Sequence, residues 1–241
     1  MLLSGNYQHF SFDLWLTLIR SNPAFKEKRA GFFHQQFNYR HLSLDNVKHT
    51  FRQVDIMCNQ INEKTGKNID ADEMYLMVLS IMNDGDARIW QIDIEKLYAD
   101  MEVMVFEYLP VAFCDRTIAT LAHLKQNTRA TTGILSNTGF IKGVTLRRVL
   151  NQIGIDRYID YQLYSDEVGM SKPNPKFFKM MLDQLSAHHT EIDLTRVIHI
   201  GDNPVADVAG ANALGLHSHL INSNNVYLPD IVNNAHHILT T

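Results

Sequence analysis

The chain has 241 residues, of which 45% are hydrophobic and 20% charged, and its formal net charge is −4. This length supports a sizeable core and one or two domains, and the absence of a basic excess gives no reason to expect a nucleic-acid partner. The sequence shows no apolar run of membrane-span length and no secretory signal, so we expect no membrane partner. Its two cysteines, Cys58 and Cys114, match no metal or redox spacing, which favours a cytoplasmic location.

The first predicted element is a short apolar strand from Tyr7 to Leu14, which contains a single carboxylate, Asp13. Amphipathic helices follow it for about ninety residues, without an intervening strand. Each begins after a residue type that caps helices, and the first also has proline at its first position. The expected capping residues are Asn22, Ser43, Asp70 and Asp93.

From Asp115 onward the pattern changes to alternating helices and short apolar strands. Repeated units of this kind indicate a parallel sheet with helices on its faces. Strands are expected at 130–136, 161–164, 196–201 and 216–221, and helices at 116–126, 140–153, 175–185 and 204–214. We therefore predict an α/β fold in which residues 1–21 and 110–241 form a doubly wound, Rossmann-type core and residues 22–109 form a helical insert.

Residues suited to catalysis follow the carboxyl ends of the predicted strands, where open parallel sheets bind their ligands. Each has an ordinary structural interpretation when taken alone, such as a turn aspartate, a helix cap or a solvated lysine. Their shared position at one edge of the sheet is what predicts a site. In chain order they are Asp13, Ser136, Asn137, Lys172, Asp202 and Asp207.

The stretches FDLWLTL, ILSN, SKPNP and IGDNPVAD resemble, in this order, the four motifs of the haloacid dehalogenase superfamily. The resemblance covers essentially the whole chain, and the helical insert falls where many members carry a cap domain. The resemblance implies that Asp13 is the nucleophile and Lys172 the cation beside it. It implies that Ser136 donates to phosphoryl oxygens and that Thr17 and Asn137 are further substrate contacts. It also implies that magnesium is held by Asp13, Asp202 and the backbone carbonyl of Trp15, with Asp207 as a supporting residue.

The chemistry of these residues agrees with that implication. Three carboxylates in one cleft repel one another, so a cation is needed to keep them ionised. Oxygen ligands without a cysteine or histidine cluster favour magnesium over zinc. A lysine such as Lys172 adds a point charge that holds Asp13 as the carboxylate and attracts a substrate anion. A carboxylate nucleophile such as Asp13 can form an acyl phosphate, which water then hydrolyses.

Trp15 departs from the pattern of the superfamily's phosphatases. The residue two places after the nucleophile is usually a second aspartate, which protonates the leaving oxygen, and the next is commonly glycine; here they are Trp15 and Leu16. An indole N–H donates a hydrogen bond but does not transfer a proton at useful pH. General acid catalysis contributes about 10² to 10⁴ in rate, so alkyl phosphates should be poor substrates.

Three functions remain open from the sequence. The first is a magnesium-dependent phosphatase for small phosphorylated substrates with good leaving groups. The second is a dehalogenase-like hydrolase for halogenated substrates, since those relatives carry an aromatic residue at the position of Trp15 and dispense with the metal. The third is a catalytically idle member that binds a phosphorylated ligand or a protein partner. Retention of Asp202 favours the first function, while the substrate and the oligomeric state are not specified.

The helical insert is expected to select the substrate. Four residues of its first helix follow the nucleophile strand closely, and three of them are basic. A basic cluster on an amphipathic helix is usually a solvated face, so we assign none of them to the site. They are Phe25, Lys26, Lys28 and Arg29.

Overall fold

The core of the molecule is a five-stranded parallel sheet, seen in a computed structural model that describes residues 7–232. The central strand β1 (His9–Phe12) pairs with β4 (Thr131–Ser136) on one side and β6 (Val197–Gly201) on the other. The edge strands are β5 (Tyr161–Tyr164) and β7 (His217–Leu220), which gives the order β5-β4-β1-β6-β7. The chain completes one half of the sheet before the other, so the predicted doubly wound α/β fold is confirmed.

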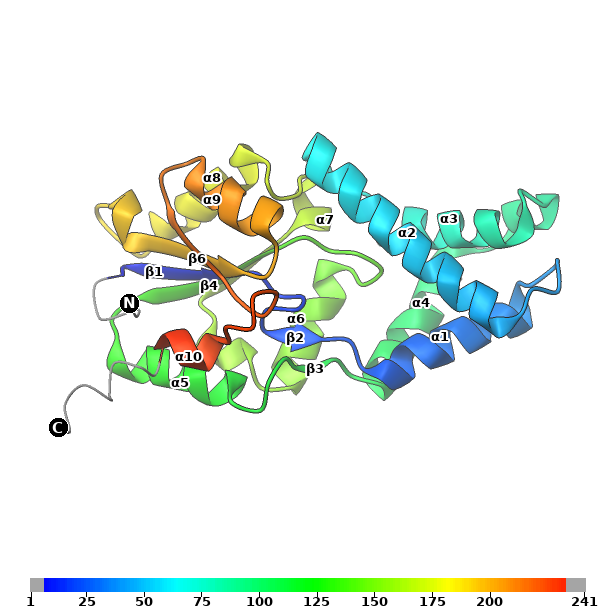
Figure 1. The fold of residues 1–241 in the computed structure, drawn as a ribbon, viewed down its shortest axis with the longest axis horizontal. Helices are drawn as coiled ribbons and strands as arrows, with labels where there is room; N and C mark the ends of the chain where they lie inside the picture. The colour runs from blue at the N-terminus through cyan, green and yellow to red at the C-terminus, as the bar shows by residue number, and fades with distance from the viewer. Residues whose placement is uncertain (1–6, 233–241) are drawn as a thin grey trace.

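Helices cover both faces of this sheet (Figure 1). On one face lie α8 (Pro175–Leu185) and α9 (Gly210–Asn212), which share a hydrophobic cluster with Leu135 and Val197 of the strands. The other face is covered by three helices that share a cluster with the central strand. They are α5 (Thr117–Asn127), α6 (Gly143–Gln152) and α10 (Leu228–Val232).

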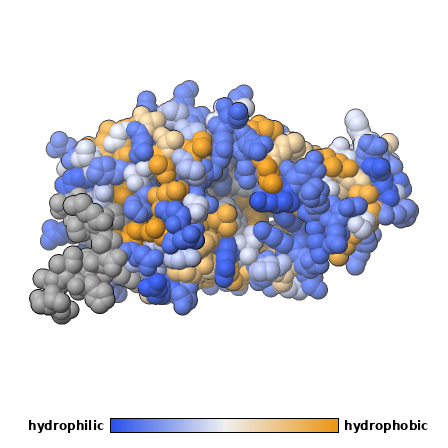
Figure 2. All heavy atoms as spheres, in the orientation of Figure 1, coloured by the Kyte–Doolittle hydropathy of each residue, from blue (hydrophilic) through white to orange (hydrophobic). Residues whose placement is uncertain are grey.

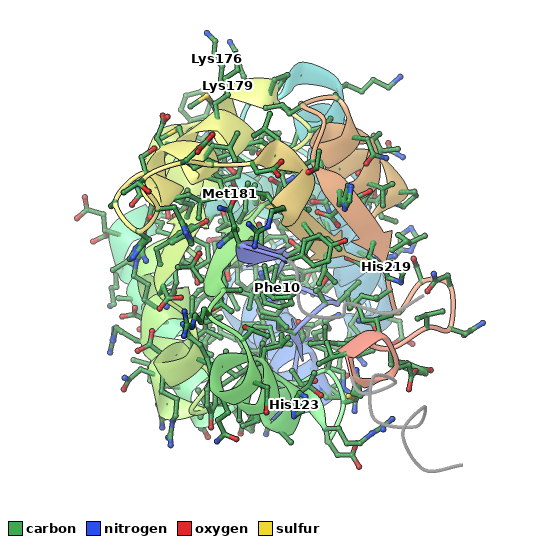
Figure 3. The ribbon with its side chains drawn as sticks, turned by 90° about the vertical axis from the view of Figure 1, so that its left-hand side faces the viewer. Phe10, His123, Lys176, Lys179, Met181 and His219 are labelled. Atoms are coloured by element: carbon green, nitrogen blue, oxygen red, sulfur yellow. The ribbon has the colours of Figure 1, made fainter. Side chains whose placement is uncertain are left out.

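The two layers are visible when the sheet is viewed from its amino ends. In Figure 3, Phe10 of β1 lies in the middle, with Met181 of α8 on one side of the strand and His123 of α5 on the other. Both Phe10 and Met181 are buried. Because both faces of the sheet are covered, all four residues of β1 are buried, and its polar residues His9 and Ser11 lie within hydrogen-bond distance of side chains on neighbouring strands.

Four helices, which follow β1 in the chain and precede the other strands of the sheet, form a separate lobe to one side of the core (Figure 1). They are α1 (Pro23–Gln36), α2 (Leu44–Thr65), α3 (Ala71–Asn83) and α4 (Ile94–Glu107). Their apolar faces meet in a separate hydrophobic cluster, to which the core contributes Phe140. Amphipathic helices bury such faces against one another, and this packing holds the lobe together.

Capping explains where these helices begin. The side chains of Asn22, Ser43 and Asp93 each accept a hydrogen bond from a backbone N–H of the first turn, as expected from the sequence. Asp70 and Glu73 form a reciprocal capping box at the start of α3. The four predicted caps are therefore confirmed.

Several short elements were not predictable from periodicity. The strands β2 (Ile19–Arg20) and β3 (Val111–Ala112) pair where the chain enters and leaves the helical lobe, but two residues are too few to show a repeat. The helix predicted at 204–214 is instead a π-helix at Pro204–Ala209 followed by α9. The remaining short helices are Ala87–Gln91, Asp156–Tyr158, α7 (Ser165–Val168) and Leu194–Arg196.

Two further features concern the expected cellular setting. Cys58 is buried in the helical lobe, Cys114 is half-buried, and both are free thiols. Within residues 7–232, no helix combines the length and the apolar character needed to cross a bilayer. The cytoplasmic location stays a prediction.

A buried histidine ties three strands of the sheet together. His9 of β1 lies within hydrogen-bond distance of Thr131 Oγ1 through Nδ1 (2.9 Å) and of the Tyr161 hydroxyl through Nε2 (2.7 Å). Its ring also stacks on that of Tyr161, with the centroids 5.3 Å apart. Burial lowers the pKa of His9 to about 3, so the ring is neutral in the folded protein.

We expect this histidine to make folding sensitive to mild acid. In the unfolded chain His9 titrates near its ordinary pKa of about 6.5, so between that pH and about 3 the unfolded state binds the extra proton and stability falls as the pH is lowered. Between pH 7 and pH 5 the free energy of unfolding should fall by about 2 kcal/mol more in the wild type than in His9→Gln, measured by urea unfolding. Parallel pH dependences in the two proteins would contradict this assignment.

Candidate active site

Three adjacent strands deliver the predicted site residues to one edge of the sheet. Asp13 follows β1, Ser136 ends β4 and Asp202 follows β6. Because β4 and β6 flank β1 in parallel, their carboxyl ends meet beside Asp13. Lys172 reaches the same place from the loop between α7 and α8.

Asp13 lies at the centre of a network of donors. Its Oδ1 accepts hydrogen bonds from Lys172 Nζ (2.8 Å) and Ser136 Oγ (3.2 Å), and its Oδ2 accepts one from Thr17 Oγ1 (3.0 Å). Burial raises the pKa of this carboxyl, and the ammonium of Lys172 opposes that rise. The charge of Asp13 therefore depends on the cation beside it.

Lys172 is fully enclosed and bridges two carboxylates. Its Nζ lies 2.8 Å from Asp13 Oδ1 and 2.6 Å from Asp207 Oδ1. Burial opposes the charge of the ammonium, but the attraction of the two carboxylates outweighs burial and raises the pKa of Lys172. An ion pair buried this deeply is stable only when both partners are satisfied, so Asp207 is part of what keeps Lys172 charged and in place.

Asn137 fixes the backbone that carries Lys172. Its side-chain Nδ2 donates to the backbone carbonyl of Lys172 (3.0 Å), and its side-chain Oδ1 accepts from the backbone N–H of Lys172 (2.7 Å). Asn137 was predicted to contact substrate; it also lines the cleft described below, so its structural role and the predicted one are compatible.

Asp207 is held by the residues around it rather than left free. Besides Lys172, its Oδ1 accepts a hydrogen bond from His199 Nε2 (3.1 Å), and its Oδ2 accepts one from the Asn203 N–H (2.9 Å). Although burial opposes ionisation, Lys172 and His199 hold the pKa of Asp207 well below its usual range. A Cβ on Gly201 would lie 2.1 Å from Asp207 Oδ2, so the glycine before Asp202 makes room for this carboxylate.

Ser11 and His199 support the site and were missed in the sequence. They are register partners on β1 and β6, and Ser11 Oγ lies 2.8 Å from His199 Nδ1. Burial lowers the pKa of His199, so its neutral ring donates from Nε2 to Asp207 and accepts from Ser11. Mid-strand residues carry no motif signal; only the strand register brings these two side chains together.

The carboxylates of Asp13, Asp202 and Asp207 lie close enough to share a cation, since one oxygen from each falls within 4.8 Å of the others. Asp207 is the least exposed of the three, at 1%, which leaves Asp13 and Asp202 as the more accessible acids. Burial, followed by the charges of Asp13 and Asp207, raises the pKa of Asp202 to about 7. A bound cation would remove that repulsion.

The backbone after Asp13 offers a third oxygen. The carbonyl of Trp15 accepts no hydrogen bond from any residue in the described range 7–232, and Trp15 lines the same cleft. The next residue, Leu16, has φ +58°, a left-handed conformation that glycine adopts without strain. Asn222 steadies this turn by donating from its side-chain amide to the Leu16 carbonyl (2.6 Å). The donor set Asp13, Asp202 and the Trp15 carbonyl suits a hard cation such as magnesium.

The site opens into a cleft of about 660 Å³ between the sheet edge and the helical lobe. Figure 2 shows a hollow at this place, bordered mainly by hydrophilic residues. Helices α1 and α2 form its far wall, and Phe25, Lys26 and Arg29 contribute to it. Arg29 is only 7% exposed, so the expectation of a solvated basic face is wrong for this residue.

Comparison with known proteins agrees with this architecture. A family model of the haloacid dehalogenase-like hydrolases matches residues 7–215. The chain belongs to this family. The hydrolase fold is shared with the HAD-hydrolase YfnB from Bacillus subtilis, solved bound to magnesium, with a TM-score of 0.70 and 16% identity over 98% of this chain and 100% of the other.

Other relatives of this hydrolase have named activities. The ribulose-1,5-bisphosphate 5-phosphatase of Halopiger xanaduensis is 37% identical over 28% of this chain and 26% of its own length. The pyrimidine 5'-nucleotidase YjjG of Escherichia coli is 33% identical over 41% of this chain and 40% of its own length. The L-2-haloacid dehalogenase of Xanthobacter autotrophicus shares the fold, with a TM-score of 0.59 and 16% identity over 89% of this chain and 77% of the other. The chain thus matches well under half the length of the phosphatase and the nucleotidase.

Proposed function

We propose that this hydrolase is a magnesium-dependent phosphatase that uses Asp13 as its nucleophile and prefers small substrates with good leaving groups. The observation that carries the proposal is the buried arrangement in which Lys172 bridges Asp13 and Asp207 while Asp202 stands beside them. The phosphatase and nucleotidase among the relatives support the same reaction class.

The helical lobe is proposed to act as a cap over the substrate, with residues 22–109 as the cap domain and residues 1–21 and 110–241 as the core domain. Its separate hydrophobic cluster and the position of the cleft support this division. Cap and core also meet through polar contacts, such as the bond that Asn203 donates from its side-chain amide to Glu63 Oε1 (2.6 Å). Contacts of this kind can break and re-form when a cap opens to admit substrate.

Asp13, Asp202 and the carbonyl of Trp15 are the groups that would hold magnesium, with Asp207 supporting Lys172. When bound, the ion supplies positive charge that offsets the repulsion between the carboxylates and the phosphoryl oxygens. Asp207 stays outside this set because it is almost fully buried and holds Lys172 and His199 in place.

In the proposed reaction the Asp13 carboxylate attacks phosphorus, the bond to the leaving oxygen breaks, and an acyl phosphate forms on Asp13. Ser136 and Thr17 already aim their hydroxyls at Asp13, which places two donors where phosphoryl oxygens would lie. Lys172 adds its charge to the same region. Water then attacks the phosphorus of the acyl phosphate and releases inorganic phosphate, which regenerates Asp13.

A dehalogenase-like reaction is the second candidate, and Trp15 is the observation that favours it. A departing halide needs no proton, so the absence of an acid two residues after Asp13 would not slow that reaction. In it, Asp13 would attack carbon rather than phosphorus and form an alkyl ester that water hydrolyses.

The proposed function predicts that phosphate release depends on magnesium and on Asp202. Purified protein should release phosphate from acetyl phosphate with magnesium and little or none after chelation. Asp202→Ala should lose magnesium binding by calorimetry, which in the wild type should give a dissociation constant between about micromolar and millimolar, because such sites keep several waters on the ion. An inactive protein that still binds orthophosphate would instead indicate an idle phosphate-binding member.

A matched control is Asp183→Ala, which removes an exposed carboxylate of α8 away from the cleft and should bind magnesium as the wild type does. Equal magnesium binding in the wild type and Asp202→Ala would remove Asp202 from the set of ligands.

A further inference from the structure

Arg29 is a buried cation on the cap side of the cleft, and the proposed reaction does not use it. It lies on α1 and is 7% exposed, yet it lines the same cleft as Asp13. Its Nε is buried and has no hydrogen-bond partner within residues 7–232. Buried polar groups are nearly always satisfied, so an unpaired guanidinium nitrogen in a residue that lines a ligand cleft needs an explanation.

Aromatic rings hold this guanidinium in position. Its Cζ lies 4.1 Å from the ring centroid of Phe51, 4.4 Å from that of Phe140 and 5.2 Å from that of Phe25. Rings attract a cation through their faces but do not neutralise its charge. Burial lowers the pKa of Arg29, and the neighbouring Tyr75 opposes this shift only in part. These rings orient the guanidinium and Asp55 attracts it from a distance, but no carboxylate forms an ion pair with it within residues 7–232.

Two other cations on this wall of the cleft, Lys48 and Arg52, already have acidic partners, while Lys26 is exposed to solvent. Lys48 lies 2.7 Å from Glu27, and Arg52 lies 3.2 Å from Asp55. Arg29 makes no ion pair within the described part of the chain, although it is much more deeply buried than Lys48 or Arg52. A charge in such a place is stable when an oxyanion from outside the chain completes it.

One of the three rings around Arg29, that of Phe140, connects it to the catalytic edge of the sheet. Phe140 belongs to the loop that begins with Ser136 and Asn137, so one segment contributes both to the contacts with Asp13 and Lys172 and to the wall around Arg29. The cleft of about 660 Å³ has the volume of a site for a whole small molecule rather than for a phosphoryl group alone. Both ends of one ligand can therefore be recognised in it.

We propose that Arg29 binds a second oxyanion of the substrate, a carboxylate or a second phosphate, while the phosphoryl group lies at Asp13. The proposal rests on the proposed phosphatase function and narrows its substrate class to small molecules that carry an anionic group at each end. Arginine suits this role because its planar fork pairs with two oxygens of a carboxylate or phosphate at once.

Non-hydrolysable phosphonates test the proposal without requiring turnover. Calorimetry in the presence of magnesium compares alkylphosphonates with ω-carboxyalkylphosphonates and alkane bisphosphonates of matched chain lengths. We expect the best ligand with two anionic groups to bind about tenfold to a hundredfold more tightly than its alkyl counterpart, as charge-assisted hydrogen bonds imply. Preference for the carboxylate or the bisphosphonate series identifies the second anion.

Variants assign the preference to Arg29. Arg29→Met keeps an unbranched apolar chain among the rings and should bind alkylphosphonates like the wild type while losing the preference for a second anion. Arg29→Lys keeps the charge without the planar guanidinium and should retain part of the preference for a second anion. Lys28→Met removes a positive charge from an exposed position of the same helix and should retain the whole preference.

The outcomes separate the two proposals. Equal affinity of the wild type for ligands with one and with two anionic groups, or an unchanged preference in Arg29→Met, would overturn the role of Arg29 and leave the phosphatase proposal standing. Failure of every phosphonate and of orthophosphate to bind would overturn both. Normal binding of alkylphosphonates by Arg29→Met shows that this variant is folded.

Discussion

Replacing Asp13 with asparagine is expected to reduce phosphate release from acetyl phosphate by at least about a thousandfold, since no other described carboxylate takes its place as nucleophile. Thr17, Ser136 and Lys172 all donate to Asp13, whereas Asp207 is 1% exposed and Asp202 accepts from none of these three side chains. The asparagine amide would keep the size of the side chain but cannot form an acyl phosphate. Steady-state assays with acetyl phosphate measure this change.

A second measurement separates a chemical loss from a structural one. Beryllium fluoride mimics the phosphoryl group on a carboxylate, so it should bind to Asp13 in the wild type with magnesium and should not bind to Asp13→Asn. Thermal unfolding of the variant checks that the fold survives the weaker contact with Lys172. Undiminished turnover in a folded Asp13→Asn protein would show that another group is the nucleophile.

Much of the fold follows from local chemistry that can be read along the chain. The caps at Ser43 and Asp93 and the apolar strands at β4 and β6 are short-range signals, and the alternation of strands and helices leaves few topologies. The π-helix at Pro204–Ala209 was not predicted because its composition is that of an ordinary helix, and its different hydrogen bonding is not visible in the sequence.

The residues that support the active site are harder to predict from the sequence than the residues of its motifs. Asp13 and Lys172 stand in recognisable stretches, but Ser11 and His199 act through a register that exists only once β1 and β6 have paired. Arg29 shows the same limit, since its helix predicts a solvated basic face, and Phe140 approaches from the core to complete the ring of aromatic side chains around it. Such contacts join residues more than a hundred positions apart, and no local pattern encodes them.

Trp15 should make the rate depend steeply on the leaving group. Acetyl phosphate and p-nitrophenyl phosphate have leaving groups that need little protonation, so they should turn over about 10² to 10⁴ times faster than glycerol phosphate. Trp15 lines the cleft, so an aspartate placed there would face the substrate, and Trp15→Asp should narrow this gap. Comparing kcat/KM for the three substrates in both proteins measures the effect.

The degree of rescue depends on the turn that carries residue 15. A general acid must lie within about 3 Å of the leaving oxygen, and Leu16 already holds the left-handed conformation that a glycine would adopt here, so the backbone can present an acid without rearranging. Trp15 also packs against the main core cluster, so the stability of Trp15→Asp has to be measured beside its rate.

Trp15→Phe is the matched control, because it keeps an aromatic ring and adds no acid. Equal rates on activated and unactivated phosphates in the wild type would mean that another residue supplies the proton. Halide release from a 2-haloacid without magnesium would instead identify the missing acid as the mark of a dehalogenase.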